Sequence, residues 1–258
     1  MSSALPPLDL HAHIDTAIAP TELLSLRSVV FAATRSLAEA KTALKRQDSQ
    51  TIWGVGCHPA ISRSHDSFNA AEFRLLASDT AFVSEIGLDG AATVSLERQL
   101  RTLRSVFDAL GEQPRVTSLH SHRATDELVT ELSARALRGV VLHWWQGDEA
   151  ATKRAIDIGC YFSINAAMFR RPRILGTIPR ERLLAETDHP YGDRGAPRPR
   201  PGNVVPVEHA LSRMLGIDPA DVRRMLWRNF DRLVREVDCT RLLPRRVRSN
   251  LIASSASS

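Results

Sequence analysis

Histidine is the residue type whose placement in this sequence most clearly indicates chemistry. Seven of the nine histidines come at or just after the end of a short apolar run: His11, His13, His58, His120, His122, His143 and His189. In "DLHAHID", His11 and His13 are two residues apart, so on a strand their side chains point the same way and can bind one metal ion together. Asp9 lies on the same face one step deeper, where it could orient a histidine from behind. An isolated H-x-H is only suggestive of a metal site.

Carboxylates follow two of the same apolar runs. Glu85 lies near the end of "FVSEIG", and Asp188 follows "LLAET". Four imidazoles and two carboxylates suit two divalent cations, with Glu85 or a water bridging them. Mixed nitrogen and oxygen ligands favour Zn, Mn, Fe or Mg over soft metals. The predicted ligands are His11, His13, Glu85, His120, His143 and Asp188.

The elements that must position these residues are short apolar runs that alternate with segments of helical periodicity. This alternation predicts an α/β fold with a parallel sheet buried on both faces. Eight strands close a (β/α)8 barrel, the length of 258 residues suits one such domain, and the carboxyl ends of barrel strands share one face. An open doubly wound sheet is the alternative. We expect strands near 8–11, 28–34, 52–57, 82–87, 116–120, 139–144, 160–165 and 183–187, with closing helices at 207–215 and 219–236.

Domain organisation follows from the same pass along the chain. We expect a single barrel domain over residues 1–240 with C-terminal helices, because the sequence contains neither an internal repeat nor a linker. Residues 241–258 are basic and then rich in serine and alanine, which predicts a loose tail.

Composition limits the classes of partner. Of the 34 lysines and arginines only Lys41, Lys45 and Lys153 are lysines, and the net charge is +5. An arginine-rich surface suits phosphate binding, although base composition of the source genome explains it equally well. No apolar run is long enough to span a membrane, and three cysteines without paired spacing favour the cytoplasm. A nucleophile elbow and a phosphate-binding glycine loop are both missing from the sequence, which argues against serine hydrolases and NTPases.

Six segments together resemble a known family. "DLHAHID", "GVGCHP", "SEIGLDG", "LHSH", "VVLHWWQG" and "LLAETDHPY" are similar, in order and spacing, to the landmarks of the TatD-like metal-dependent hydrolases. The resemblance runs from Leu8 to "RNFDRLV" at 228–234. It implies an amidohydrolase-like (β/α)8 barrel that hydrolyses DNA phosphodiesters, often as a 3′-end exonuclease acting on single strands, with two divalent metals. It also assigns the six ligands above, places His58 near the substrate phosphate and makes Glu186 a supporting residue. The short form is similar to members encoded in bacterial anti-phage clusters, which would imply protein partners.

The chemistry implied by this resemblance follows from the ligands. Two cations roughly 3.5–4 Å apart would lower the pKa of a bridging water and polarise a phosphate oxygen. Asp188 is the candidate general base, and His58 could hydrogen-bond the phosphate or protonate the leaving group. For His58 and Glu186 the alternatives are a turn histidine before Pro59 and a merely buried carboxylate.

The departures from the family pattern concern substrate contacts. The family usually has arginine two residues after the fifth-strand histidine, whereas this chain has His122 followed by Arg123. Either could neutralise a phosphate. The usual "HCFSG" is "HWWQG" here; Trp144 or Trp145 could stack on a base, while one of them more plausibly packs beneath the loop. We expect Trp53 and Cys57 to be core residues and His189 to shape its loop or assist catalysis.

Two other functions stay open at this point. One is an amidohydrolase-type enzyme that cuts a small amide, ester or lactone; many of these bridge their metals with a carboxylated lysine, and none of the three lysines lies at a predicted strand end. The other is a binding protein without catalysis, against which the complete ligand set argues.

Overall fold

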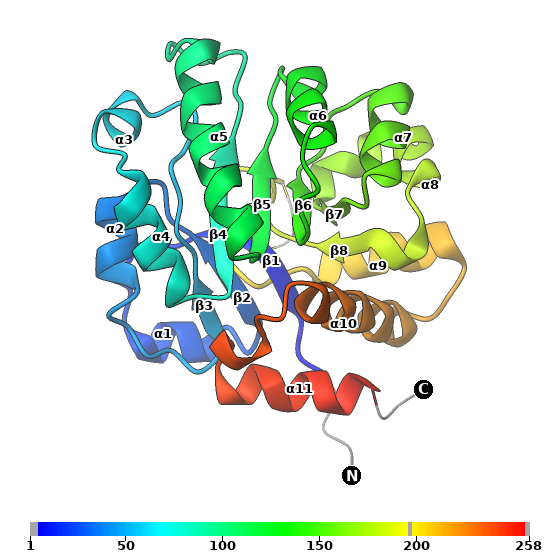
Figure 1. The fold of residues 1–258 in the computed structure, drawn as a ribbon. Helices are drawn as coiled ribbons and strands as arrows, with labels where there is room; N and C mark the ends of the chain where they lie inside the picture. Colours follow the sequence, from blue (N-terminus) through cyan, green and yellow to red (C-terminus); the bar gives the residue numbers. More distant parts are fainter. Residues whose placement is uncertain (1–4, 196–197, 256–258) are drawn as a thin grey trace.

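Eight parallel strands form the centre of the molecule, as a computed structural model that describes residues 5–195 and 198–255 shows (Figure 1). The strands pair in two runs, β1-β2-β3 and β4-β5-β6-β7-β8. They are β1 (Leu8–His13), β2 (Val29–Ala33), β3 (Thr51–Trp53), β4 (Phe82–Gly87), β5 (Val116–His120), β6 (Val140–His143), β7 (Tyr161–Ile164) and β8 (Leu183–Ala185).

Backbone contacts at two seams join the runs into a closed barrel. At the first seam Val55, just past β3, bridges Val83 of β4 in parallel fashion. At the second, the Asp188 N–H donates to the His11 carbonyl at 2.8 Å, and the His13 N–H donates to the His189 carbonyl at 2.9 Å. The fold is therefore the predicted (β/α)8 barrel, and the open sheet is wrong.

Helices surround the barrel and carry local start signals that the sequence encodes. The side chains of Ser36, Asn69, Ser95, Asp148 and Asp218 each accept a backbone N–H from the first turn of the helix that follows. The helices are α1 (Pro20–Ser25), α2 (Leu37–Ala43), α3 (Ser62–Asp66), α4 (Ala70–Ser78), α5 (Leu96–Glu112), α6 (Thr125–Ser133), α7 (Glu149–Asp157), α8 (Pro172–Thr177), α9 (Val205–Leu215), α10 (Pro219–Glu236) and α11 (Arg245–Ser255), with 3-10 turns η1 (Ala166–Arg170), η2 (Arg180–Arg182) and η3 (Thr240–Leu242).

One hydrophobic cluster closes the barrel at the starts of its strands. It joins residues at the starts of strands, such as Leu8, Val29 and Phe82, to apolar side chains of α10 and α11. Phe31 and Phe230 meet edge to face within it, with ring centroids 5.3 Å apart. This packing leaves the opposite ends of the strands as the open face of the barrel.

The C-terminal segment corrects one prediction. Residues 245–255 form α11, and its side chains Val247 and Leu251 are buried in the cluster that closes the barrel. The segment is not a loose tail, because apolar residues four positions apart give the helix one face that packs on α10 and the strand starts. Residues 256–258 lie outside the described residues.

Among the described residues, none of the helices combines the length and apolar character needed to cross a membrane.

Candidate metal centre

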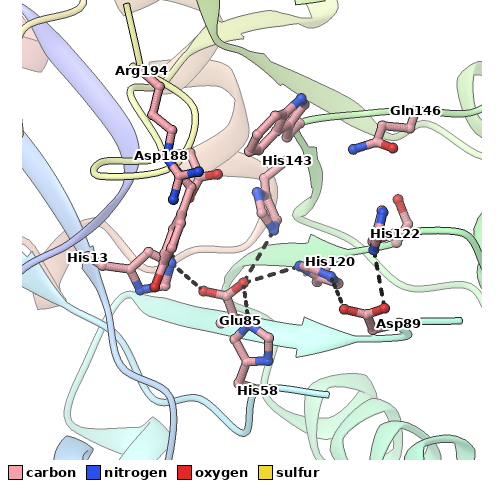
Figure 2. A pocket seen from close by; sticks show the side chains of 13 residues that line it. His13, His58, Glu85, Asp89, His120, His122, His143, Gln146, Asp188 and Arg194 are labelled. Atoms are coloured by element: carbon pink, nitrogen blue, oxygen red, sulfur yellow. Dashed lines mark hydrogen bonds and ion pairs between the residues drawn. The ribbon is translucent and has the colours of Figure 1, made fainter. Parts of the chain in front are cut away.

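Glu85 occupies the middle of the open face, and one of its oxygens points at the end of β1 (Figure 2). Its Oε2 atom lies 2.7 Å from Nε2 of His13 and 3.3 Å from Nε2 of His11. Asp188 approaches the same imidazoles from beyond β8, with Oδ1 3.6 Å from His13 Nε2 and 4.0 Å from His11 Nε2. Two imidazoles and two carboxylates therefore converge from three strands that are far apart in sequence.

The other oxygen of Glu85 faces a second set of histidines. Oε1 lies 3.2 Å from His120 Nδ1, 3.4 Å from His58 Nε2 and 3.6 Å from His143 Nε2. Burial and the nearby His11 lower the pKa of His143 well below its ordinary value. A neutral imidazole is the form that binds a metal.

The residues present fit divalent cations. Both ring nitrogens of His143 and Nδ1 of His13 are buried and have no hydrogen-bond partner among the described residues. Such buried polar atoms are costly unless something binds them. Four overlapping groups of side chains bring three ligand atoms within 4.8 Å of one another, and Glu85 belongs to two of these groups. The arrangement suits cations on both sides of one shared carboxylate.

The backbone at the site is held in unusual conformations. Glu85, Trp144 and Asp188 adopt positive φ angles of 49°, 40° and 45°. For residues with a side chain this left-handed region costs about 1–3 kcal/mol, and the surrounding fold must supply it. The backbones of β4 and β5 approach each other closely at Gly87, where a β carbon would lie 2.0 Å from the carbonyl oxygen of His120.

Buried hydroxyls and carboxylates behind the ligands fix their orientation, although one predicted support acts elsewhere. Oγ of Ser118 on β5 lies 2.7 Å from Nδ1 of His11. The Asp9 carboxylate does not reach a histidine ring; it accepts the N–H and hydroxyl of Thr187 at 2.8 and 2.7 Å and the N–H of Gly202 at 2.8 Å. Asp9 therefore ties β1 to the segment after β8, which corrects the expectation that it orients a histidine.

Glu186 is fully buried beneath the site, and its carboxylate accepts hydrogen bonds from several groups. It accepts the Ser163 hydroxyl, the Asn165 side-chain amide at 3.1 Å and the Trp144 N–H at 2.9 Å. Its Oε1 lies 3.9 Å from Nδ1 of His143. Glu186 thus holds the loop after β6 in place behind the metal ligands.

Burial and neighbouring charges shift the pKa values of several groups in the cluster. Burial raises the pKa of Asp188 to about 8, and the Glu85 charge acts in the same direction. Burial also raises the pKa of Glu186 well above its usual value, and the charge of Asp188 adds to this. Burial lowers the pKa of His120, but hydrogen bonds to Asp89 and Glu85 outweigh it and raise this pKa to about 9. Cations bound here would displace the protons of Asp188 and His120.

His58 is held in a single tautomer. Burial lowers its pKa to about 4, so the ring is neutral near pH 7. The Ala60 N–H donates to its Nδ1 at 3.0 Å, which leaves the proton of the neutral ring on Nε2. That N–H points into the site, toward Oε1 of Glu85.

These side chains surround a cavity of about 420 Å³. His13, His58, Glu85, His120, His143 and Asp188 line it, while His11 and Glu186 lie buried beneath. His122 and Trp144, two residues for which the sequence predicts substrate contacts, also line the cavity, whereas the exposed Arg123 is not among the lining residues.

Comparison with known proteins identifies the family. Residues 8–235 match the family described as TatD related DNase. The chain belongs to this family.

Relatives within and near the TatD family share nearly the whole chain. The Cronobacter sakazakii protein named 3′-5′ ssDNA/RNA exonuclease TatD is 27% identical over 231 residues, which cover 80% of this chain and 86% of that protein. An Escherichia coli K12 protein named uncharacterized metal-dependent hydrolase YcfH is 24% identical over 249 residues, which cover 90% and 92% of the two chains. The crystal structure of YjjV, a TatD homologue from Escherichia coli K12, has the same fold, with a TM-score of 0.78 at 21% identity over 90% of this chain and 98% of that chain.

Sequence reasoning missed several residues at this TatD-family site. Asp89 accepts from His120 Nε2 at 3.3 Å and contacts Nδ1 of His122 at 3.2 Å. Its place in "EIGLDG", four residues after Glu85, was the available sign. Gln146, Tyr191 and Arg194 also line the cavity, but they sit in loops without periodicity.

Two tryptophans, a cysteine and a histidine that were singled out in the sequence lie around the TatD-family site. Trp145 is buried, and its Nε1–H donates to Thr152 at 2.8 Å, so it is the tryptophan that packs beneath the loop. Trp53 and Cys57 are core residues, as predicted. Nδ1 of His189 lies 2.8 Å from Oδ2 of Asp193, a contact within its own loop.

Proposed function

We propose that this protein is a two-metal nuclease of the TatD type that removes nucleotides from the 3′ ends of single-stranded DNA. The observation that carries the proposal is that the two carboxylate oxygens of Glu85 face different groups of histidines. Oε2 faces His11 and His13, while Oε1 faces His120 and His143. A carboxylate with ligand groups on both sides is suited to bridge two cations. The name of the Cronobacter sakazakii relative supports the direction and the kind of substrate.

The proposed ligand set is divided between the two cations. His11, His13 and Asp188 would hold one, and His120 and His143 the other, with Glu85 between them. Two divalent cations supply an activated water and stabilise charge on the phosphate. Mn, Zn and Mg all accept mixed nitrogen and oxygen ligands, so the donor set does not choose among them.

The protein's own groups would handle the protons. Asp188 is proposed as the general base, because its carboxylate reaches both imidazoles of β1 and lies at the cavity surface. His58 is proposed to donate a hydrogen bond from its Nε2–H to the leaving oxygen or to a phosphate oxygen while keeping its proton, since its other nitrogen accepts the Ala60 N–H. Glu186 is proposed as a positioning residue, because its donors lock Trp144 and the loop after β6.

The cavity favours a chain end over a duplex. At about 420 Å³ it has the volume of a small-molecule site and holds a nucleotide rather than a helix. Trp144 is half-buried, packs against the core and lines the cavity, so it can stack on a base. His122, held by Asp89, can donate to a phosphate.

The small-molecule alternative finds less support in the structure. Lys41 on α2 pairs with Glu72, and Lys153 on α7 pairs with Asp157, so these lysines lie on the outer helices. Glu85 occupies the bridging place that a carboxylated lysine would need.

The test uses end-labelled single-stranded DNA with Mg²⁺, Mn²⁺ or Zn²⁺ in turn. We expect the protein to shorten the strand stepwise from its 3′ end and Asp188→Asn to lose at least about 100-fold in rate. Asp157→Asn, an exposed carboxylate on α7, is the matched control and should keep full activity. Intact DNA under every cation, with a protein that binds two, would refute the proposal.

A further inference from the structure

The segment that follows β5 contributes a histidine, His122, to the cavity but no arginine. The neighbouring Arg123 is exposed and does not line the cavity. Among the described residues a single arginine lines the cavity, and it comes from another part of the barrel. This is Arg194, in the loop that follows β8.

Contacts with the metal centre hold Arg194 at the cavity. Its guanidinium carbon lies 5.6 Å from the ring centroid of Tyr191. The Tyr191 ring in turn meets the His13 ring edge to face, with centroids 5.6 Å apart. A chain of ring contacts therefore connects Arg194 to a predicted metal ligand, and Figure 2 shows Arg194 reaching from its loop toward Asp188.

The loop itself is anchored on both sides of Tyr191. The Tyr191 and Gly192 N–H groups donate to the Asp188 carbonyl at 2.7 and 2.8 Å. Asp193, buried beside Arg194, contacts His189 Nδ1 at 2.8 Å. The tyrosine is 45% exposed, so its ring stands at the cavity mouth as a support rather than as core.

We propose that Arg194, held by Tyr191, binds the phosphate of the substrate next to the proposed metal centre. The inference rests on the proposed nuclease function. A guanidinium stacked on a ring keeps its N–H edge available, and that edge matches two phosphate oxygens at once. A fixed fork also loses less freedom when it binds than a mobile side chain does.

Cleavage rates of Arg194 variants, compared with a matched arginine control, test whether Arg194 binds the phosphate. Arg194→Ala should lower kcat/KM on single-stranded DNA by about 10–100-fold, with unchanged metal stoichiometry. Arg194→Lys should recover only part of this loss, because an ammonium group lacks the fork. Arg101→Ala, an exposed arginine on α5 paired with Glu97, should behave as the parent protein. Tyr191→Ala should reproduce part of the Arg194→Ala defect, and Tyr191→Phe, which keeps the ring, should show a smaller defect than Tyr191→Ala.

Salt dependence separates a phosphate contact from a structural role. In an Asp188→Asn background, which prevents turnover, Arg194→Ala should reduce the slope of log affinity against log salt for single-stranded DNA by about 0.7. An unchanged slope and rate in a protein that cleaves DNA would overturn the role of Arg194 alone. Failure of the parent protein to bind or cleave DNA would instead overturn the proposed function, so the two failures are distinguishable.

Discussion

The hydroxyl of Ser118 lies 2.7 Å from Nδ1 of His11, across the barrel from β5 to β1. His11 is fully buried, so this contact fixes both the ring plane and the nitrogen that faces Glu85. The hydroxyl is small and neutral, yet it orients the ring of a proposed metal ligand.

Removing this hydroxyl should weaken metal binding without unfolding the protein. We expect Ser118→Ala to lower cation affinity by about 10–100-fold, the usual effect of losing a hydrogen bond to a ligand histidine. Isothermal titration calorimetry measures it. Ser105→Ala, at a half-buried serine on α5 whose hydroxyl donates to the Arg101 carbonyl, is the control and should leave affinity unchanged. Equal affinities for the two variants would show that Ser118 does not orient the ligand.

Glu85→Gln should separate the two halves of the centre. The amide keeps the size of the side chain but loses the charge that both histidine groups share, so we expect fewer than two cations per chain and at least about 100-fold less activity. Metal analysis after gel filtration gives the count. A variant that still holds two cations tightly would mean that water alone bridges them.

Metal binding should release protons and strengthen as pH rises. Burial raises the pKa of Asp188 to about 8, so at pH 7 without cations most of this carboxyl is protonated. A cation must displace that proton and the proton of His120, whose pKa is raised to about 9, so affinity should increase as pH rises and level off only above about pH 9. Calorimetry at pH 7 in two buffers with different ionisation enthalpies reports the protons released. Identical enthalpies in both buffers would contradict the expectation.

The last helix should contribute to global stability. Leu251→Ala removes a buried side chain from the hydrophobic cluster at the strand starts and leaves a cavity there. This should lower the free energy of unfolding by about 2–5 kcal/mol. Its neighbour Ile252 is 70% exposed, so Ile252→Ala should change stability by less than about 0.5 kcal/mol. Urea denaturation of both variants makes the comparison. Similar losses from the two would mean that α11 does not pack as described.

Local patterns were sufficient to predict the barrel and the convergence of the proposed ligands on one of its faces. The two-residue period of β1 puts His11 and His13 on one side, and the barrel brings His120, His143 and Asp188 to the same face. The period does not say which neighbour an inward side chain meets. Asp9 points inward as expected, but the segment that reaches it is Thr187 and Gly202 rather than a histidine.

Loop residues of the site could not be predicted, because their positions depend on contacts between distant segments. Tyr191 and Arg194 show no periodicity, and their place is set by hydrogen bonds to Asp188 and by the ring of His13. The last helix was missed for another reason. Basic and small residues dominate its composition, and two apolar residues, Val247 and Leu251, are enough to dock it.

The described part of the barrel is closed at the strand starts by α10 and α11, and the cavity lies at the opposite ends of the strands. In the proposed nuclease, a cut nucleotide and the shortened strand would then leave from the face by which the strand entered. The strand would not advance through the barrel as it would through a tunnel. We expect the protein to release the DNA strand after each cut, so that cleavage is distributive. All the long strands in a population should then shorten together, rather than one molecule at a time.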